Sequence, residues 1–481
     1  MAPNNNALRW FRRDLRLSDN PALQAATEWA RERGGSVLPV YIASDTEAGA
    51  WKDGAASRWW LHHSLTALSQ TLNARGSRLV VRTGATLEVL KDVVSEAGIG
   101  AVFWNRLYEP ASIERDRVVK AALREHGLHV ASSNAALLHE PWTIKTRTGG
   151  PYKVFTPFSR TLSALPTPAP IAGPEVLPAP PSQVTGLALN DLHLLPSIPW
   201  DGGMRDAWEP GESGARTLLD DFIEAPVADY PQARDFPDRA GTSRLSAALH
   251  FGEISPRQAW FAARAAQPEV SGPWLRQLQW REFAHHQLFH FPRTPDQPLD
   301  PRYATFSWRS DYQADLRAWQ RGQTGIPIVD AGMRELWHTG WMHNRVRMLV
   351  ASLLTKNLLI PWQEGARWFW DTLVDADLAN NTLGWQWTAG CGADAAPYFR
   401  VFNPATQGLK FDPDGRYVRR WVPELKRLPD KWLQQPWTAP AEVLRGCGVR
   451  LGRDYPMPIV DLAESRRIAL EIWANEVRHK P

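Results

Sequence analysis

The chain has 481 residues, a formal net charge of +4 and a pI near 9.0, with 43% hydrophobic and 22% charged residues. This composition is that of an ordinary globular protein, the length predicts two domains, and the small positive charge indicates only a weak preference for polyanions. No run of 18 apolar residues occurs and the first residues lack an apolar signal stretch, so neither a transmembrane helix nor secretion is predicted. Cys391 and Cys447 are the only cysteines. Two cysteines exclude a disulfide scaffold and a four-cysteine metal or iron–sulfur site, and they fit a reducing cytoplasm.

Residues 6–135 alternate strand-like and helix-like segments. The predicted strands are 7–11, 37–42, 78–82, 101–104 and 129–132, and the predicted helices are 21–33, 55–75, 85–97 and 110–126. This alternation predicts an α/β domain with a doubly wound parallel sheet, which binds ligands beyond the carboxyl ends of its strands. No GxGxxG follows the first strand and no Walker A lysine motif occurs, so a classical dinucleotide or nucleoside triphosphate site is not expected.

The rest of the chain divides into a connection and a helical part. Seven prolines between Pro166 and Pro181 predict extended, semi-rigid backbone. Three- and four-residue apolar spacing predicts helices at 255–266, 274–290, 312–321, 328–338, 342–359 and 362–374. We therefore predict three parts: an α/β domain at 1–135, an interdomain linker at 136–215 and an all-α domain at 216–481.

Tryptophan is unusually abundant, and 16 of the 25 tryptophans follow residue 216. A single tryptophan most often fills a core or an interface. Such a density in a helical region also indicates stacking or electron transfer.

The stretch 371–407 is the most informative part of the chain. It combines two acids, two amides and two tryptophans before an aromatic and basic segment that ends at Gln407: Asp375, Asp377, Asn380, Asn381, Trp385 and Trp387. Buried polar groups need partners, so the mixture indicates a pocket for a flat, polar, redox-active ring beside a surface that can stack bases. A paired-carboxylate hydrolase is a poor alternative, because no nucleophile or metal cluster accompanies the acids.

Three further motifs mix polar and aromatic groups. The hydroxyl-rich turn 242–246 can be an anion site at a helix N-terminus or a plain capping box. Trp274, Gln277 and Arg281 share one helical face by their spacing. His343 follows His338 by five residues rather than four, so this pair is not expected to bind a metal.

With these motifs the chain resembles the DNA photolyase and cryptochrome flavoprotein family over nearly its whole length. It looks most like a class I cyclobutane pyrimidine dimer photolyase. The resemblance implies light-driven repair of DNA by electron transfer from excited reduced FAD, in a monomeric cytoplasmic enzyme that binds double-stranded DNA containing a pyrimidine dimer. It also implies a place for an antenna chromophore in the first domain, with Arg12, Asn105 and Glu109 in the candidate loops, and the sequence leaves a folate, a deazaflavin, a flavin or no chromophore open.

The resemblance assigns roles to individual residues. The implied FAD-binding residues are Tyr230, Thr242, Ser243, Arg244, Leu245, Ser246, Trp274, Gln277, Arg281, Asn344, Arg347, Asp375, Asp377 and Asn381. The implied catalytic and lesion-facing residues are Gln277, Trp280, Asn344, Met348, Asn381 and Trp387. The implied DNA contacts are Arg234, Trp280, Arg281, His343, Asn344, Arg400 and Gln407. The implied electron relay runs from Trp385 through Trp362 to Trp308.

Two residues of these sets bear on the alternatives. Asn381 faces flavin N5 by resemblance, where a neutral amide favours reduced flavin. Together with the absence of a long segment after Pro481, it argues against a cryptochrome-like blue-light sensor. Gln277 stands where class I enzymes usually carry Glu and is similar to the (6-4) photolyase branch, but that branch carries His where this chain has Asn344. A glutamate at position 277 is expected to have a raised pKa beside a flavin and DNA phosphates.

Overall fold

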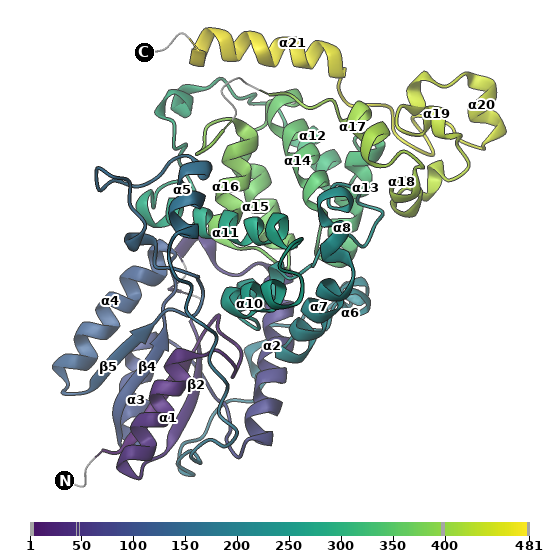
Figure 1. Cartoon of the computed structure of the whole chain (residues 1–481). Helices are drawn as coiled ribbons and strands as arrows, with labels where there is room; N and C mark the ends of the chain where they lie inside the picture. The colour runs from purple at the N-terminus through teal and green to yellow at the C-terminus, as the bar shows by residue number, and fades with distance from the viewer. Residues whose placement is uncertain (1–3, 45, 48, 396–399, 479–481) are drawn as a thin grey trace.

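The computed structural model describes residues 4–44, 46–47, 49–395 and 400–478. A five-stranded parallel sheet has the order β3-β2-β1-β4-β5. Figure 1 labels β2, β4 and β5 of this sheet, near the N-terminus. The strands are β1 (Asn6–Phe11), β2 (Val37–Ala43), β3 (Val80–Thr83), β4 (Ile99–Asn105) and β5 (His129–Ser133). All five predicted strands are confirmed to within two residues at either end.

Four helices cover the two faces of this sheet: α1 (Pro21–Arg33), α2 (Ala55–Ala74), α3 (Thr86–Ala97) and α4 (Pro110–Glu125). Apolar side chains of α1 and α2 share one core with one face of β1 and β2, and those of α3 and α4 share another core with the opposite face. Burial on both faces explains why the central strands read as nearly continuous apolar runs. The predicted doubly wound domain is therefore confirmed.

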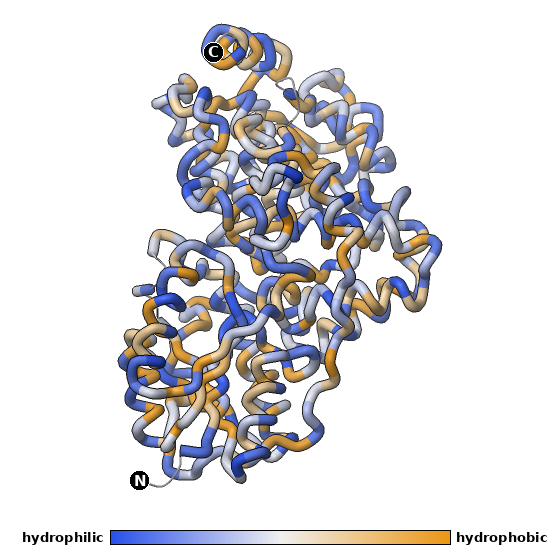
Figure 2. Tube along the Cα trace, turned by 60° about the vertical axis from the view of Figure 1, so that its left-hand side comes forward, coloured by the Kyte–Doolittle hydropathy of each residue, from blue (hydrophilic) through white to orange (hydrophobic). Residues whose placement is uncertain are grey.

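The C-terminal part is helical. Its helices are α7 (Glu212–Glu224), α8 (Pro226–Ala233), α9 (Ser246–Phe251), α10 (Pro256–Ala266), α11 (Gly272–His290), α12 (Gln313–Gln320), α13 (Pro327–Thr339), α14 (Asn344–Ser352), α15 (Trp362–Thr372), α16 (Leu378–Ala389), α17 (Pro404–Phe411), α18 (Arg416–Trp421), α19 (Asp430–Leu433), α20 (Ala441–Gly446) and α21 (Leu462–Trp473). The single helix predicted at 342–359 is α14 followed by a π-helical turn, Leu353–Asn357. Hydrophobic and hydrophilic residues alternate along the trace in Figure 2. Among the described residues, no helix is long and apolar enough to cross a membrane.

The segment 136–215 contacts both parts of the molecule. Its proline-rich stretch forms no helix or strand, yet Leu177 and Val184 are buried against the α/β domain. Two helices also lie in it, α5 (Phe155–Ser163) and α6 (Gly202–Ala207). Helix α5 packs against α11 in the helical part, so the segment contributes side chains to cores that its sequence did not reveal.

Direct contacts also join the two domains. The turn after α9 approaches the end of β1 so closely that a Cβ on Gly252 would lie 2.3 Å from the carbonyl oxygen of Arg13. The Arg257 guanidinium donates to Asp19 at 3.0 Å, and the Trp60 indole donates to Glu253 at 2.9 Å. Buried polar bonds of this kind fix the relative orientation of the two domains.

Glu253 makes stability at this junction depend on pH. Its Oε1 also accepts from Gly211 N at 2.7 Å, and burial raises its pKa to about 7. The pKa of Glu253 in the folded protein exceeds the unfolded value of ~4.3. The contribution of Glu253 to folding stability is therefore complete below pH ~4.3 and is lost as the pH rises towards 7. Glu253→Gln keeps the Oε1 acceptor and cannot titrate. As pH rises from 5 to 8, we expect the free energy of unfolding of this variant to increase relative to that of the wild type by about 1–3 kcal/mol.

The measurement is the unfolding midpoint of both proteins at each pH. The exposed Glu442 provides the control, since Glu442→Gln should leave the difference between the two pH values unchanged. Parallel pH curves for the wild type and Glu253→Gln would contradict the assignment.

Candidate functional site

An ion pair at the centre of the helical domain joins α14 to the residues just before α16. The Arg347 guanidinium donates to both carboxylate oxygens of Asp375, at 3.1 and 2.8 Å, and its Nε donates to the Met342 carbonyl at 2.8 Å. Asp375 is buried and Arg347 is partly buried. The ion pair therefore holds two elements of the site in register.

Asp377 begins α16. Its Oδ1 accepts from Asn380 N at 2.8 Å, while its Oδ2 lies 3.5 Å from His285 Nε2 and 3.6 Å from His250 Nδ1. Burial alone would raise the pKa of Asp377, but electrostatic interaction with the neighbouring imidazoles of His285 and His250 holds this pKa well below the usual value. The contacts seen for Asp377 are thus those of a charged helix cap, and its flavin contact stays a prediction.

Asn381 and Trp385 lie one turn apart on α16. Asn381 is half-buried, and its side-chain N–H donates to the Ala366 carbonyl at 3.0 Å. Trp385 is buried, and it lies so close to α15 that a Cβ on Gly365 would come within 2.0 Å of the indole. The amide and the indole are therefore both fixed by contacts with α15.

The hydroxyl-rich turn packs beside α11, because the Trp274 indole donates to Ser243 Oγ at 3.3 Å. Arg244 has a positive φ of 53°, and its guanidinium lies over the rings of Trp208 and Trp341 at 4.1 and 5.1 Å. Its buried Nε has no hydrogen-bond partner among the described residues. Helix α9 is only six residues long, so its N-terminus contributes little to anion binding. The hydroxyls of the turn and the Arg244 guanidinium, whose Nε has no partner in the described part of the chain, favour an anion more strongly.

Other residues predicted for the cofactor surround this turn. Tyr230 is buried on α8, with the Arg234 guanidinium 5.1 Å from its ring. Thr242 is half-buried, Leu245 is buried and Ser246 is exposed. Phosphate groups fit such a turn, because it offers hydroxyls and an orphaned guanidinium N–H to an anion.

Residues predicted to face a lesion lie on three helices that pack together. Helices α11 and α14 both contact α16, and they carry Trp280, Asn344 and Met348, while α16 carries Trp387. Asn344 is exposed at the first position of α14, and Met348 is half-buried one turn later. The tryptophans are half-buried, so each has a face or edge open to a base.

Gln277 lies beside a cation. Its Oε1 accepts from Arg234 Nη2 at 3.5 Å, and its Nε2 donates to the Pro273 carbonyl at 3.3 Å. A glutamate at this position would therefore face Arg234, and an adjacent cation favours the carboxylate. The raised pKa expected from the sequence for such a glutamate beside flavin and DNA phosphates stays a prediction, and Arg234 is a neighbour with the opposite effect that the sequence did not reveal.

Two predicted DNA contacts are turned inward. Arg281 is only 11% exposed, and its guanidinium donates to the carbonyls of Ala136 and Leu249 at 2.6 and 3.4 Å. His343 is 2% exposed, accepts from Arg345 N at 3.2 Å and caps α14, and burial lowers its pKa to about 4. These internal bonds and this burial leave neither side chain presented at the surface, so a phosphate contact by Arg281 or His343 stays a prediction to which the structure gives no support.

The other predicted DNA contacts are more accessible. Arg400 is exposed, with its guanidinium 4.7 Å from the Phe402 ring, and Gln407 is half-buried on α17. Tyr398 and Phe399 of the aromatic and basic segment lie outside the described residues.

The relay tryptophans differ in exposure. Trp385 and Trp362 are each 2% exposed, whereas Trp308 is half-buried and contacts Phe306 at a ring distance of 4.6 Å. This order fits a path from the interior to the surface.

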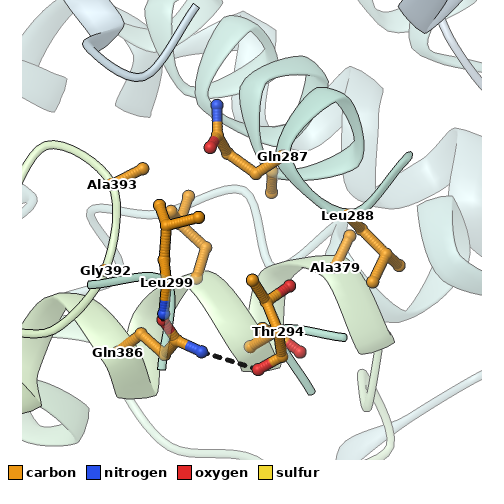
Figure 3. A pocket seen from close by; sticks show the side chains of 11 residues that line it. Gln287, Leu288, Thr294, Leu299, Ala379, Gln386, Gly392 and Ala393 are labelled. Carbon is orange, nitrogen blue, oxygen red and sulfur yellow. Dashed lines mark hydrogen bonds between the residues drawn. The ribbon is translucent and has the colours of Figure 1, made fainter. Parts of the chain in front are cut away.

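Gln386 organises the end of α16 and was missed by sequence reasoning. Its side-chain N–H groups donate to the carbonyls of Thr294 and Gln297 at 2.6 and 2.8 Å, and its Oε1 accepts from Leu299 N at 2.9 Å. Figure 3 shows Gln386 and Thr294 in a small pocket between α11 and α16. The only sequence signal was an amide between two site tryptophans.

The candidate antenna residues form a closed network at the ends of β1 and β4. Arg12 donates to Asp116 at 2.7 Å, Asn105 donates to Asp14 at 2.7 Å, and Glu109 pairs with Arg13. Each of these three side chains is therefore bonded to another side chain of the first domain. No group of His, Cys, Asp or Glu within the described residues is arranged to hold a metal ion.

Comparisons with known proteins agree with this architecture. A model of the FAD binding domain of DNA photolyase matches residues 274–475, and a DNA photolyase model matches residues 7–178. The deoxyribodipyrimidine photo-lyase of Agrobacterium fabrum is 49% identical over 97% of each chain, and cryptochrome-2 of Arabidopsis thaliana is 41% identical over 97% of this chain and 78% of its own. A crystal structure of a bacterial class III photolyase from Agrobacterium tumefaciens superposes with a TM-score of 0.94 at 48% identity, covering 98% of both chains. The chain belongs to the DNA photolyase family, and its helical part is the FAD-binding domain of that family.

Proposed function

We propose that the protein is a monomeric, light-driven enzyme that repairs cyclobutane pyrimidine dimers in double-stranded DNA. The observation that supports this most is the Arg347–Asp375 pair. It ties α14, which carries Asn344 and Met348, to the start of α16, which carries Asn381. One ion pair thus holds the residues that would face the lesion beside those that would hold the flavin. Class I membership stays a prediction, since the solved structure with 48% identity is described as class III.

The chain's residues would bind and orient the two reactants. FAD, when bound and reduced, supplies the photo-excited electron that opens the cyclobutane ring. The turn 242–246 would bind its phosphates, while Asn381 presents an amide that offers no acidic proton. Trp280 and Trp387 would stack on a dimer extruded from the duplex and exclude water, and Asn344 could bond to its carbonyls.

The test uses purified holoprotein with chemically reduced flavin and two oligonucleotides, one with a cyclobutane dimer and one with a (6-4) lesion. Repair of the cyclobutane dimer under blue light is expected. Repair of the (6-4) lesion alone would overturn the proposal and make Gln277 the better guide to lesion class. Absence of repair of both lesions with intact flavin would favour a cryptochrome-like sensor, which the 41% identity to cryptochrome-2 keeps as a second candidate.

We also propose that residues 1–135 hold an antenna chromophore, residues 136–215 link the domains and residues 216–481 are catalytic. The closed network around Arg12, Asn105 and Glu109 leads us to place the chromophore elsewhere in the first domain or at its surface. Chromatography of the chromophores released by denaturation tests this, and FAD alone would contradict it.

DNA binding should depend on salt through exposed cations. We expect Arg400→Ala to reduce the slope of log affinity against log salt by about one unit, because one phosphate contact is lost. Arg281→Ala is the matched control, since the Arg281 guanidinium is bound internally and its loss should leave the slope unchanged. An unchanged slope in Arg400→Ala would remove this residue from the DNA surface.

A further inference from the structure

Trp280 is backed by an aromatic ring from a distant segment. The Phe155 and Trp280 rings lie face to face, with centroids 3.7 Å apart and planes 5° apart. Phe283 meets both rings edge-on, at 5.8 Å from Trp280 and 5.9 Å from Phe155. Phe155 is 1% exposed, whereas Trp280 is half-buried. One face of the indole is therefore covered by Phe155, and the accessible part lies away from it.

Phe155 is itself held in place from several directions. It is the first residue of α5, which packs along α11, and its backbone N–H donates to Asp394 Oδ1 at 3.4 Å. Asp394 N donates in turn to the Lys153 carbonyl at 3.1 Å. The Arg276 guanidinium lies 4.8 Å from the centre of the Phe155 ring. The ring thus has little freedom to move.

These contacts also connect the two tryptophans predicted to face the lesion. Trp280 lies on α11, and Asp394 lies in the loop that follows α16 and Trp387. The segment Lys153–Phe155 contacts the indole of Trp280 and also the loop that follows Trp387. A change at Phe155 should therefore act on the lesion surface without removing any group that touches DNA or flavin.

We propose that Phe155 is a positioning residue for Trp280. It holds the indole in the orientation in which the open face can stack on an extruded pyrimidine dimer. A base that stacks on a preordered ring immobilises no further side chain, so the entropy lost on binding is smaller. This inference rests on the proposed function, because it assumes that Trp280 faces the lesion.

The test compares Phe155→Leu, which removes the ring but keeps an apolar side chain, with Phe155→Tyr, which keeps the ring. Affinity is measured for duplexes with and without a cyclobutane dimer, using holoprotein with its normal flavin absorbance. We expect Phe155→Leu to lose about twofold to tenfold in affinity for the dimer duplex alone, and Phe155→Tyr to restore it. Phe158→Leu is the matched control, because Phe158 is equally buried on α5 and contacts Phe283 rather than Trp280.

A double-mutant cycle separates positioning from general packing. If Phe155 acts through Trp280, Phe155→Leu should have no further effect on dimer affinity in a Trp280→Ala background. An equal loss in both backgrounds, or an equal loss in Phe158→Leu, would overturn the inference. Failure of the proposed function would look different, because Trp280→Ala itself would then leave the preference for dimer DNA unchanged.

Discussion

Trp385→Phe should block photoreduction of oxidised flavin and leave dimer repair by already reduced flavin largely intact. Trp385 lies one turn after Asn381 on α16 and is the innermost tryptophan of the predicted relay. Phenylalanine keeps an aromatic ring against Gly365 and Phe369, whose ring centroid lies 5.0 Å from that of Trp385, so the fold should be retained. Only the easily oxidised indole is lost. The measurement is the change in flavin absorbance under blue light with an external reductant.

Trp319 provides a matched control for this experiment. It is fully buried, its ring lies 6.3 Å from that of Trp385, and its indole donates to the Val350 carbonyl at 3.0 Å. It is not part of the relay predicted from the sequence. Trp362→Phe should slow photoreduction while Trp319→Phe should not. The reverse result would redirect the path through Trp319, and normal photoreduction in Trp385→Phe would make Trp385 a packing residue.

The sheet and most helices could be predicted because their signals are local. The apolar run at 37–42 and the three- and four-residue spacing at 255–266 are each complete within a few residues, and both elements lie where the pattern indicated. The pair of Arg347 and Asp375 could be anticipated only through resemblance, since no local pattern joins residues 28 positions apart.

The partners that define the site's details could not be predicted, because they come from distant segments. The local sequence predicts that Arg281 is a surface cation, yet its guanidinium donates a hydrogen bond to the Ala136 carbonyl. The sequence places Phe155 in the predicted linker, yet its ring stacks on that of Trp280, 125 residues later. Periodicity shows which face of a helix is apolar, but it does not show which segment covers that face.

The ion pair of the site has the largest expected effect on cofactor binding. Asp375→Ala leaves the partly buried Arg347 guanidinium without its carboxylate partner, although the bond to the Met342 carbonyl remains, and breaking a buried pair by removing one member costs about 3–5 kcal/mol. Because Arg347 retains 23% exposure, water should compensate in part, so we place the loss in stability near the lower end of that range. We expect a lower unfolding midpoint and purified protein with much less than one flavin per chain.

A second variant separates folding from flavin binding. Replacing both members, as in Arg347→Met with Asp375→Leu, removes the charges together, and such apolar replacements often restore stability. If the pair also orients the flavin, this double variant should recover the unfolding midpoint while its flavin content stays low. Glu464→Ala, which breaks an exposed ion pair with Arg467 on α21, is the control and should leave both quantities unchanged. A double variant with full flavin content would show that Arg347 and Asp375 serve only to join α14 to α16.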